Sequence, residues 1–315
     1  MTTAQQKHRT AMSRALVASA VAFLIVAGIQ QLEAAVPAVP SISGPIVDGG
    51  LMYPNPAVNV VPEAVQVEDF PYLTEEYFVS GIANGAPYTT RIIVRRPERT
   101  TDFSGTVVAE AQHSGGRSLI FEWSRVSILG RRHLFVEIVH SGANVALIKT
   151  FNPVRYAALS ISGGQGNEII AQVGRLIKSE AAPFHAYGIK RMTLMGTSAS
   201  SGTVRTYLAA HPNLRMPDGG PIYDGFLLTS TNGNTPLPIV DVPMIQMPTQ
   251  TEVTTWAQAG IAYRRPDSDA PSNRFRLYEV AGMPHNNARD IPFFFTDPCT
   301  LPITDFPAGS FTPSH

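Results

Sequence analysis

Between residues 76 and 282, short apolar runs alternate with stretches of helical periodicity, and this alternation constrains the fold more than any other feature of the sequence. Strands that alternate with helices need crossover connections, which give a mainly parallel sheet with helices on both faces. The sequence therefore predicts an α/β fold. The strand-like runs are residues 76–83, 89–97, 105–113, 133–142, 191–196, 223–230, 242–249 and 275–282.

The first two runs are predicted to pair as an antiparallel hairpin that turns around Asn84 and Gly85. Helices are expected around residues 118–129, 167–180 and 201–212, the last of them ended by Pro212. In residues 167–180 the apolar side chains fall on one helical face, which predicts that this face packs on the sheet. These side chains are Ile169, Ile170, Val173, Leu176 and Ile177.

The N-terminus has the three parts of a secretory signal peptide. Basic residues up to Arg14 precede an uncharged run over residues 15–29, and small residues follow at Ala34 and Ala35. The apolar run is shorter than the roughly 20 residues of a spanning helix. We therefore predict a signal peptide over residues 1–35, export to the periplasm or the medium, and no stable membrane insertion after cleavage; an uncleaved membrane anchor is the alternative.

The mature chain, residues 36–315, is expected to form a single domain with an irregular N-terminal arm and a short C-terminal tail. The arm can supply an edge strand. The 24 basic and 24 acidic residues balance, so the composition gives no sign of a nucleic-acid partner. Cys299 is the only cysteine, which excludes an intrachain disulfide and cysteine-based metal sites.

Residues 191–211 place four hydroxyl side chains between a strand and a helix. Gly196-Thr197-Ser198-Ala199-Ser200 fits a nucleophile elbow, the sharp turn that lifts a serine above the sheet, with Ser200 in the place where the elbow usually has glycine. Centring the pattern on Ser200 loses the glycine at the strand exit, so Ser198 is the preferred nucleophile and Ser200 the reserve. Thr197 and Ser201 have the character of helix caps or packing residues, and all four hydroxyls could merely cap the helix.

A serine nucleophile needs a histidine base and a carboxylate, which follow it along the chain in elbow hydrolases. Among the later histidines, His211 lies in the same predicted helix and His315 is the last residue, which leaves His285. Glu252 follows the run 242–249 and is the preferred acid, with Asp224 in reserve.

An oxyanion hole would take one backbone N–H from Ala199, directly after the nucleophile. The second is expected from Gln112 or His113, in a loop that Gly115 and Gly116 allow to approach the substrate closely, although these glycines could simply form a turn. A second histidine, His140, follows the next strand and is interpreted as a pocket wall or a packing residue.

The chain resembles the exported α/β-hydrolase domain proteins of bacteria, a family of serine hydrolases. The resemblance covers nearly the whole mature chain and lies in six segments that occur in order. It implies an α/β-hydrolase fold, hydrolysis of carboxylic esters, and a triad of Ser198, Glu252 and His285, with no cofactor or metal and a small-molecule ester as substrate. The segments are residues 103–114, 151–159, 196–202, 222–227, 242–252 and 278–285.

Two positions depart from the family pattern: Ala199 replaces a usual glutamine, and Thr254 replaces a frequent acidic residue. These departures motivate a second hypothesis, a catalytically silent exported binding protein on the same fold. Hydrolysis of amide or peptide bonds by the same triad is a third reading that the sequence does not separate from the first.

Overall fold

The computed structural model describes residues 34–53, 67–231 and 235–285. The chain divides into two units, Met1–Ala35 and Val36–His315. The predicted signal peptide lies outside the described residues except for its last two, and so do Cys299 and the expected C-terminal tail. Signal peptide and export therefore stay predictions. Within the described ranges, no helix has the length and apolar character needed to cross a membrane.

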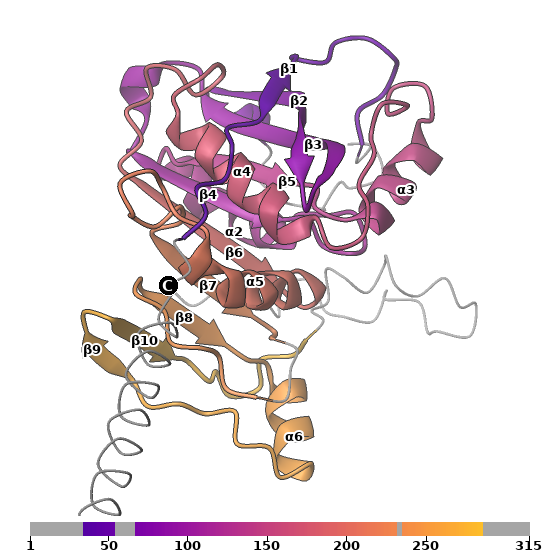
Figure 1. Ribbon diagram of the computed structural model, residues 1–315. Helices are drawn as coiled ribbons and strands as arrows, with labels where there is room; N and C mark the ends of the chain where they lie inside the picture. The colour runs from indigo at the N-terminus through magenta and orange to yellow at the C-terminus, as the bar shows by residue number, and fades with distance from the viewer. Residues whose placement is uncertain (1–33, 54–66, 232–234, 286–315) are drawn as a thin grey trace, which may run out of the picture. The chain divides into compact units, whose positions relative to one another are not determined.

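The described part of the second unit is built on one ten-stranded sheet, in the order β1-β2-β3-β5-β4-β6-β7-β8-β10-β9 (Figure 1). The six strands from β5 to β10 in this order pair in parallel, while β1, β2, β3 and β9 pair antiparallel with their neighbours. The mainly parallel sheet predicted from the sequence is confirmed. The strands are β1 Ser41–Ser43, β2 Tyr72–Ala83, β3 Ala86–Pro97, β4 Thr106–Ala111, β5 Leu134–Ile138, β6 Arg191–Thr197, β7 Gly225–Thr229, β8 Met244–Met247, β9 Ser268–Ala270 and β10 Asn273–Leu277.

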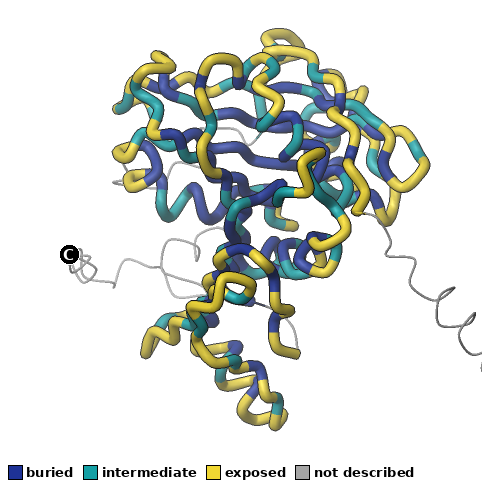
Figure 2. The backbone as a smooth tube through the Cα atoms, turned by 60° about the vertical axis from the view of Figure 1, so that its left-hand side comes forward, coloured by how far each residue is buried: buried dark blue, intermediate teal, exposed yellow. Residues whose placement is uncertain are grey.

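Helices pack on both faces of the sheet. Side chains alternate between faces along a strand, and on β4 the residues Val107 and Ala109 join a core with α4 and α5, whereas Val108 joins a second core with α2. The buried residues accordingly concentrate in the central strands (Figure 2). The α-helices are α2 Leu119–Gly130, α3 Gly142–Phe151, α4 Gly166–Lys178, α5 Ala199–Ala210 and α6 Gln250–Gln258, and the 3-10 turns are Val67–Asp69, Thr100–Asp102 and His211–Asn213.

Several local predictions are confirmed. The hairpin of β2 and β3 turns at Asn84 and Gly85, which both have positive φ angles, 49° and 72°, as the tight two-residue turn requires. The five apolar side chains of α4 predicted to face the sheet are all buried. The N-terminal arm supplies β1, which pairs antiparallel with β2 as an edge strand.

Two helices differ from the sequence expectations. The run 133–142 was expected to be one strand, but β5 ends at Ile138 and α3 begins at Gly142, where the Ser141 hydroxyl accepts a hydrogen bond from the Asn144 N–H at 3.2 Å. The residues after the run 242–249 form α6, a helix that was not predicted from the sequence. Both helices begin at hydroxyl caps, and their weak apolar periodicity gave no other signal.

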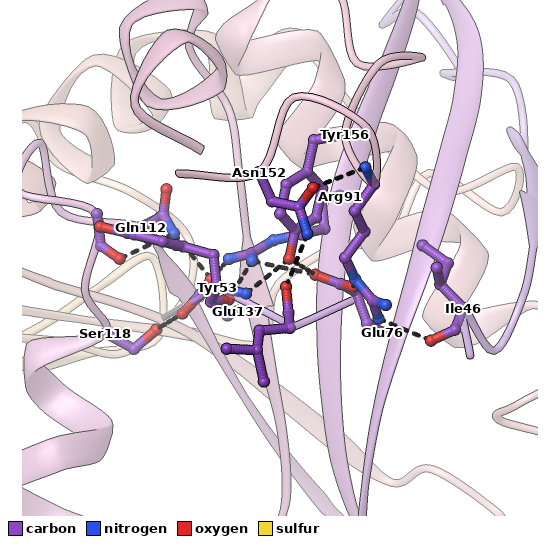
Figure 3. A network of polar contacts seen from close by, with 12 residues as sticks. Ile46, Tyr53, Glu76, Arg91, Gln112, Ser118, Glu137, Asn152 and Tyr156 are labelled. Carbon is purple, nitrogen blue, oxygen red and sulfur yellow. Dashed lines mark hydrogen bonds and ion pairs between the residues drawn. The ribbon is translucent and has the colours of Figure 1, made fainter. Parts of the chain in front are cut away.

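A set of buried charges joins the outer strands to the N-terminal arm. We call Glu76, Arg91, Glu137 and Arg155 the buried ion network; the first three are labelled in Figure 3. Arg91 pairs with Glu76 at 3.1 Å and also with Glu137, and Arg155 pairs with Glu76 at 2.7 Å. Burial lowers the pKa of Arg91, but the nearby carboxylates of Glu137 and Glu76 raise it by more than burial lowers it. The net shift is upward, and the guanidinium stays charged.

A close approach of β6 to α5 at Gly196 is a further constraint on the fold. A Cβ atom on this residue would lie 2.5 Å from the Ser200 carbonyl oxygen and 2.8 Å from the Ser201 nitrogen. Both neighbours are backbone atoms of α5 and cannot rotate away. Only glycine therefore allows the strand to turn directly into this helix.

Removal of one charge from the buried ion network should strongly destabilise the fold, because it leaves a buried guanidinium short of a partner. We expect Glu76→Gln to lower the free energy of unfolding by about 3–5 kcal/mol in urea denaturation. The neighbouring Glu75 pairs with Arg96 at 2.8 Å with its side chain 19% exposed, and Glu75→Gln should cost only about 0–1 kcal/mol. Similar losses in both variants would contradict the role given to the network.

A matched pair of glycines tests the strand-to-helix turn. Gly196→Ala should lower the free energy of unfolding by about 1–3 kcal/mol, because the methyl group meets backbone. Gly202 also lies in this region, inside α5, but an added Cβ there would meet no atom within 4 Å. Gly202→Ala should be neutral or stabilise the helix by up to about 1 kcal/mol. Thermal and urea unfolding followed by circular dichroism measure both, and a harmless Gly196→Ala would refute the steric explanation.

Candidate active site

Ser198 occupies the turn between β6, which ends at Thr197, and α5, which begins at Ala199. Its backbone has φ 51° and ψ −121°, a conformation that residues with side chains rarely adopt and that costs of order 1–3 kcal/mol. The Ser198 N–H donates to the Thr229 carbonyl at 3.2 Å, and the Ser198 carbonyl accepts from the Gly202 N–H at 3.2 Å. These bonds to β7 and α5 hold the strained residue in place.

The predicted catalytic side chains come together at this turn. Ser198 Oγ lies 2.9 Å from His285 Nε2, and His285 Nδ1 lies 2.5 Å from Glu252 Oε1. The three residues follow β6, β8 and β10, whose carboxyl ends meet at one edge of the parallel sheet. A hydroxyl, an imidazole and a carboxylate thus form one continuous hydrogen-bonded chain.

Glu252 is oriented by its own helix. It is the third residue of α6, and its Oε2 accepts from the Thr249 N–H at 2.7 Å and from the Thr249 hydroxyl, which leaves Oε1 for His285. Burial raises the pKa of Glu252, but the hydrogen bonds from His285 and Thr249 outweigh it and the pKa is lowered. Thr249 belongs to the candidate site and was not predicted from the sequence, although the Thr-x-x-Glu pattern of a capping box is present.

The Ser200 and Ser201 hydroxyls bind backbone atoms of the turn. The Ser200 hydroxyl donates to the Thr197 carbonyl at 2.8 Å and accepts from the Thr197 N–H at 2.9 Å, so the reserve nucleophile is buried and occupied. The Ser201 hydroxyl donates to the Ser198 carbonyl at 2.7 Å. Of these serines, Ser198 is the one that faces His285.

The reserve acid Asp224 lies at the opposite end of the strands. It precedes β7, where its carboxylate accepts from the Met192 N–H at 2.7 Å and from Lys178 Nζ at 3.0 Å. The site therefore does not include it. His211 is likewise engaged elsewhere, since its Nε2 lies 2.8 Å from Asp241 Oδ1.

His140 lies beside α5 rather than in the triad. Its Nε2 is 2.9 Å from the Thr203 hydroxyl, and burial lowers its pKa to about 4. The ring is therefore neutral near pH 7, in agreement with its interpretation as a packing residue.

The expected oxyanion donors lie in different situations. Ala199 is the first residue of α5, so its N–H has no carbonyl four residues earlier within the helix. The Gln112 N–H, in contrast, donates to the Ile138 carbonyl at 2.9 Å, and the His113 N–H donates to the Arg117 carbonyl at 2.9 Å. As backbone donors to a substrate, Gln112 and His113 are thus already engaged by the sheet and by the turn that follows it.

Two further N–H groups of this loop are also engaged. Those of Gly115 and Gly116 donate to His113 Nδ1 at 3.0 Å and to the His113 carbonyl at 2.8 Å. Within the described residues, the Ser114 N–H makes no such bond. The described ranges also contain no group of three or more His, Cys, Asp or Glu side chains suited to hold a metal ion.

The lowered pKa of Glu252 gives a pH dependence with a definite sign. Because the folded state favours the carboxylate, this group stabilises the protein above its ordinary pKa of 4.5, and the contribution disappears as the pH falls through the lower folded value. Wild-type protein should therefore exceed Glu252→Gln in free energy of unfolding at about pH 7, and this advantage should shrink by about pH 3. Urea titrations of both proteins measure it; a difference that does not change with pH would contradict the assignment.

No curated sequence matches the chain. Among solved structures, esterase Est22 has 12% identity and a TM-score of 0.42 over 67% of this chain and 72% of that one. A bacterial heroin esterase has 10% identity and a TM-score of 0.44 over 74% and 81%. An esterase of Pyrobaculum calidifontis has 10% identity and a TM-score of 0.43 over 68% and 78%.

The family comparison covers most of the chain. A model described as "Alpha/beta hydrolase domain" matches residues 42–309. This range includes the strand-to-helix turn at Ser198 and the segments that carry Glu252 and His285, and the sheet agrees with the fold that the resemblance implied. The chain belongs to the alpha/beta hydrolase domain family.

Proposed function

We propose that the protein is a serine hydrolase that cleaves carboxylic esters through an acyl-enzyme. The hydrogen-bonded chain from Ser198 through His285 to Glu252 is the observation that supports this proposal most directly. A hydroxyl is a weak nucleophile near neutral pH and gains reactivity from an adjacent base. In this arrangement the imidazole can take the hydroxyl proton while the oxygen attacks.

In the first half-reaction, Ser198 Oγ bonds to the ester carbonyl carbon and His285 Nε2 takes its proton. Glu252 Oε1 accepts a hydrogen bond from His285 Nδ1 and stabilises the imidazolium. The tetrahedral intermediate collapses, the bond to the alkoxy oxygen breaks, and Nε2 returns the proton to the departing alcohol. The acyl group then remains on Ser198.

In the second half-reaction, water attacks the acyl carbon and gives its proton to His285 Nε2. The ester bond to Ser198 breaks, the serine regains its proton, and the carboxylic acid leaves. The oxyanion of both steps is placed against the Ala199 N–H, at the N-terminus of α5. For the second donor we propose the Ser114 N–H, since those of Gln112 and His113 bind carbonyls.

The nucleophile is tested with an alkyl fluorophosphonate probe and p-nitrophenyl esters of graded chain length. We expect wild-type protein to be labelled once per chain, and Ser198→Ala to lose the label and at least about 10⁴-fold in kcat/KM while remaining folded. Ser200→Ala, which removes the neighbouring hydroxyl, should still be labelled. Mass spectrometry of the labelled peptide locates the adduct.

The outcomes separate the candidate functions. Labelling that persists in Ser198→Ala would overturn the choice of nucleophile. A folded wild-type protein that neither takes the label nor hydrolyses any ester would favour the silent binding protein.

A further inference from the structure

The loop that follows β4, residues 112–118, is hydrogen-bonded to the buried ion network. We call it the oxyanion loop, in accordance with the proposed function on which this section rests. Gln112 Nε2 donates to Glu137 Oε1 at 2.9 Å and to the Gly116 carbonyl at 3.2 Å, and the Ser118 hydroxyl donates to Glu137 Oε2 (Figure 3). One carboxylate on β5 therefore holds the loop at both of its ends.

Glu137 is in turn fixed by charges that water does not reach. Its partner Arg91 has no exposed side-chain surface, and Arg91 also binds Glu76, which pairs with Arg155. Two guanidinium groups face two carboxylates in this set. Because an unpaired buried charge is costly, the four side chains have little freedom to rearrange independently.

The same network binds residues 46–53 of the N-terminal arm. Arg155 donates to three backbone carbonyls of the arm, those of Ile46 at 2.7 Å, Asp48 at 2.7 Å and Gly50 at 3.0 Å. A second set of bonds holds Tyr53, whose carbonyl accepts from Arg91 and whose N–H donates to the Tyr156 hydroxyl at 2.7 Å. The Tyr156 hydroxyl donates to Glu76 Oε1 at 2.8 Å.

The arm also contacts the oxyanion loop directly. Gly116 has φ +78°, and a Cβ atom there would lie 2.1 Å from the Tyr53 hydroxyl and 2.5 Å from Leu147 Cδ2. Tyr53 thus packs against the middle of the loop, while Glu137 holds its ends. From the α3 side, Asn144 Nδ2 donates to the His113 carbonyl at 2.9 Å.

We infer that residues 46–53 and the buried ion network support catalysis indirectly, because they set the position of the oxyanion loop. Gln112 is the positioning residue that transmits this constraint, through its side chain and not its backbone N–H. Glu76, Arg91 and Arg155 have hydrogen bonds to the network and the arm but none to Ser198, His285 or Glu252. Their effect on the reaction is therefore indirect.

The first test compares two buried glutamines. Gln112→Leu removes the bonds to Glu137 and Gly116 but keeps the backbone N–H. Gln172→Leu is the matched control, since Gln172 is equally buried and donates to the Ile82 carbonyl at 2.6 Å, on the α4 face. We expect Gln112→Leu to lose about tenfold or more in kcat/KM for a p-nitrophenyl ester, and the control to stay within about twofold.

A pair of ketones separates positioning from a general loss of stability. A trifluoromethyl ketone adds to the catalytic serine and forms an oxyanion, whereas the methyl ketone of the same chain length binds without forming one. In Gln112→Leu the inhibition constant of the trifluoromethyl ketone should rise by the same factor by which kcat/KM falls. That of the methyl ketone should change by less than about twofold.

A milder pair tests the arm and decides the question if Gln112→Leu does not fold. Tyr156→Phe removes the hydroxyl that joins Tyr53 to Glu76, and Tyr223→Phe removes a hydroxyl that donates to the Ile170 carbonyl at 2.8 Å on the other face. The two variants should lose similar stability. Tyr156→Phe should raise the inhibition constant of the trifluoromethyl ketone about threefold or more, and Tyr223→Phe should leave it unchanged.

Each result supports or overturns the inference. If Gln112→Leu and Tyr156→Phe have the same inhibition constants as their control variants for both ketones, the network only stabilises the fold and the inference is wrong. That outcome is distinct from failure of the proposed function, in which wild-type protein itself would neither take the fluorophosphonate label nor bind the trifluoromethyl ketone better than the methyl ketone.

Discussion

A guanidinium with no access to water, that of Arg91, determines much of what surrounds it. Its charge must be matched inside the protein, and Glu76 and Glu137 match it from the strands on either side of β3. Each carboxylate then needs further donors, which come from Arg155 on one side and from Gln112 and Ser118 on the other. The consequence is a continuous set of polar contacts across three strands, from the N-terminal arm to the loop that follows β4.

The local parts of the fold were predictable because their signals lie within a few residues. Each of three features depends only on neighbours in the chain: the Asn84-Gly85 turn, the apolar face of residues 167–180, and Gly196 ahead of Ser198. Chain order then selected His285 and Glu252, and the structure joins both by hydrogen bonds to Ser198 in one chain of contacts. Each short apolar run predicts a strand, and the sheet brings the ends of its parallel strands to one edge. The residues that directly follow such runs can therefore be predicted to lie near one another.

The contacts that join distant segments could not be predicted in the same way. Residues 89–97 contain three arginines with the same local character, and nothing nearby shows that Arg91 is fully buried between two carboxylates while Arg96 pairs with a partly exposed one. The partners of Arg91 lie 15 and 46 residues away in sequence. The prediction of the backbone donors in the oxyanion loop differs from the structure for a related reason. The sequence suggested Gln112 and His113, but their N–H groups donate to carbonyls of the sheet and of the turn.

The strained backbone of Ser198 has a consequence for how such a protein can change. A residue with a side chain at φ 51° is less stable there than glycine would be, so the serine that is present is not the most stable residue for this turn. Selection for a more robust fold and selection for a serine held above the sheet act in opposite directions at this single position. In a lineage without the proposed reaction, the turn would be free to relax while every strand of the sheet is kept.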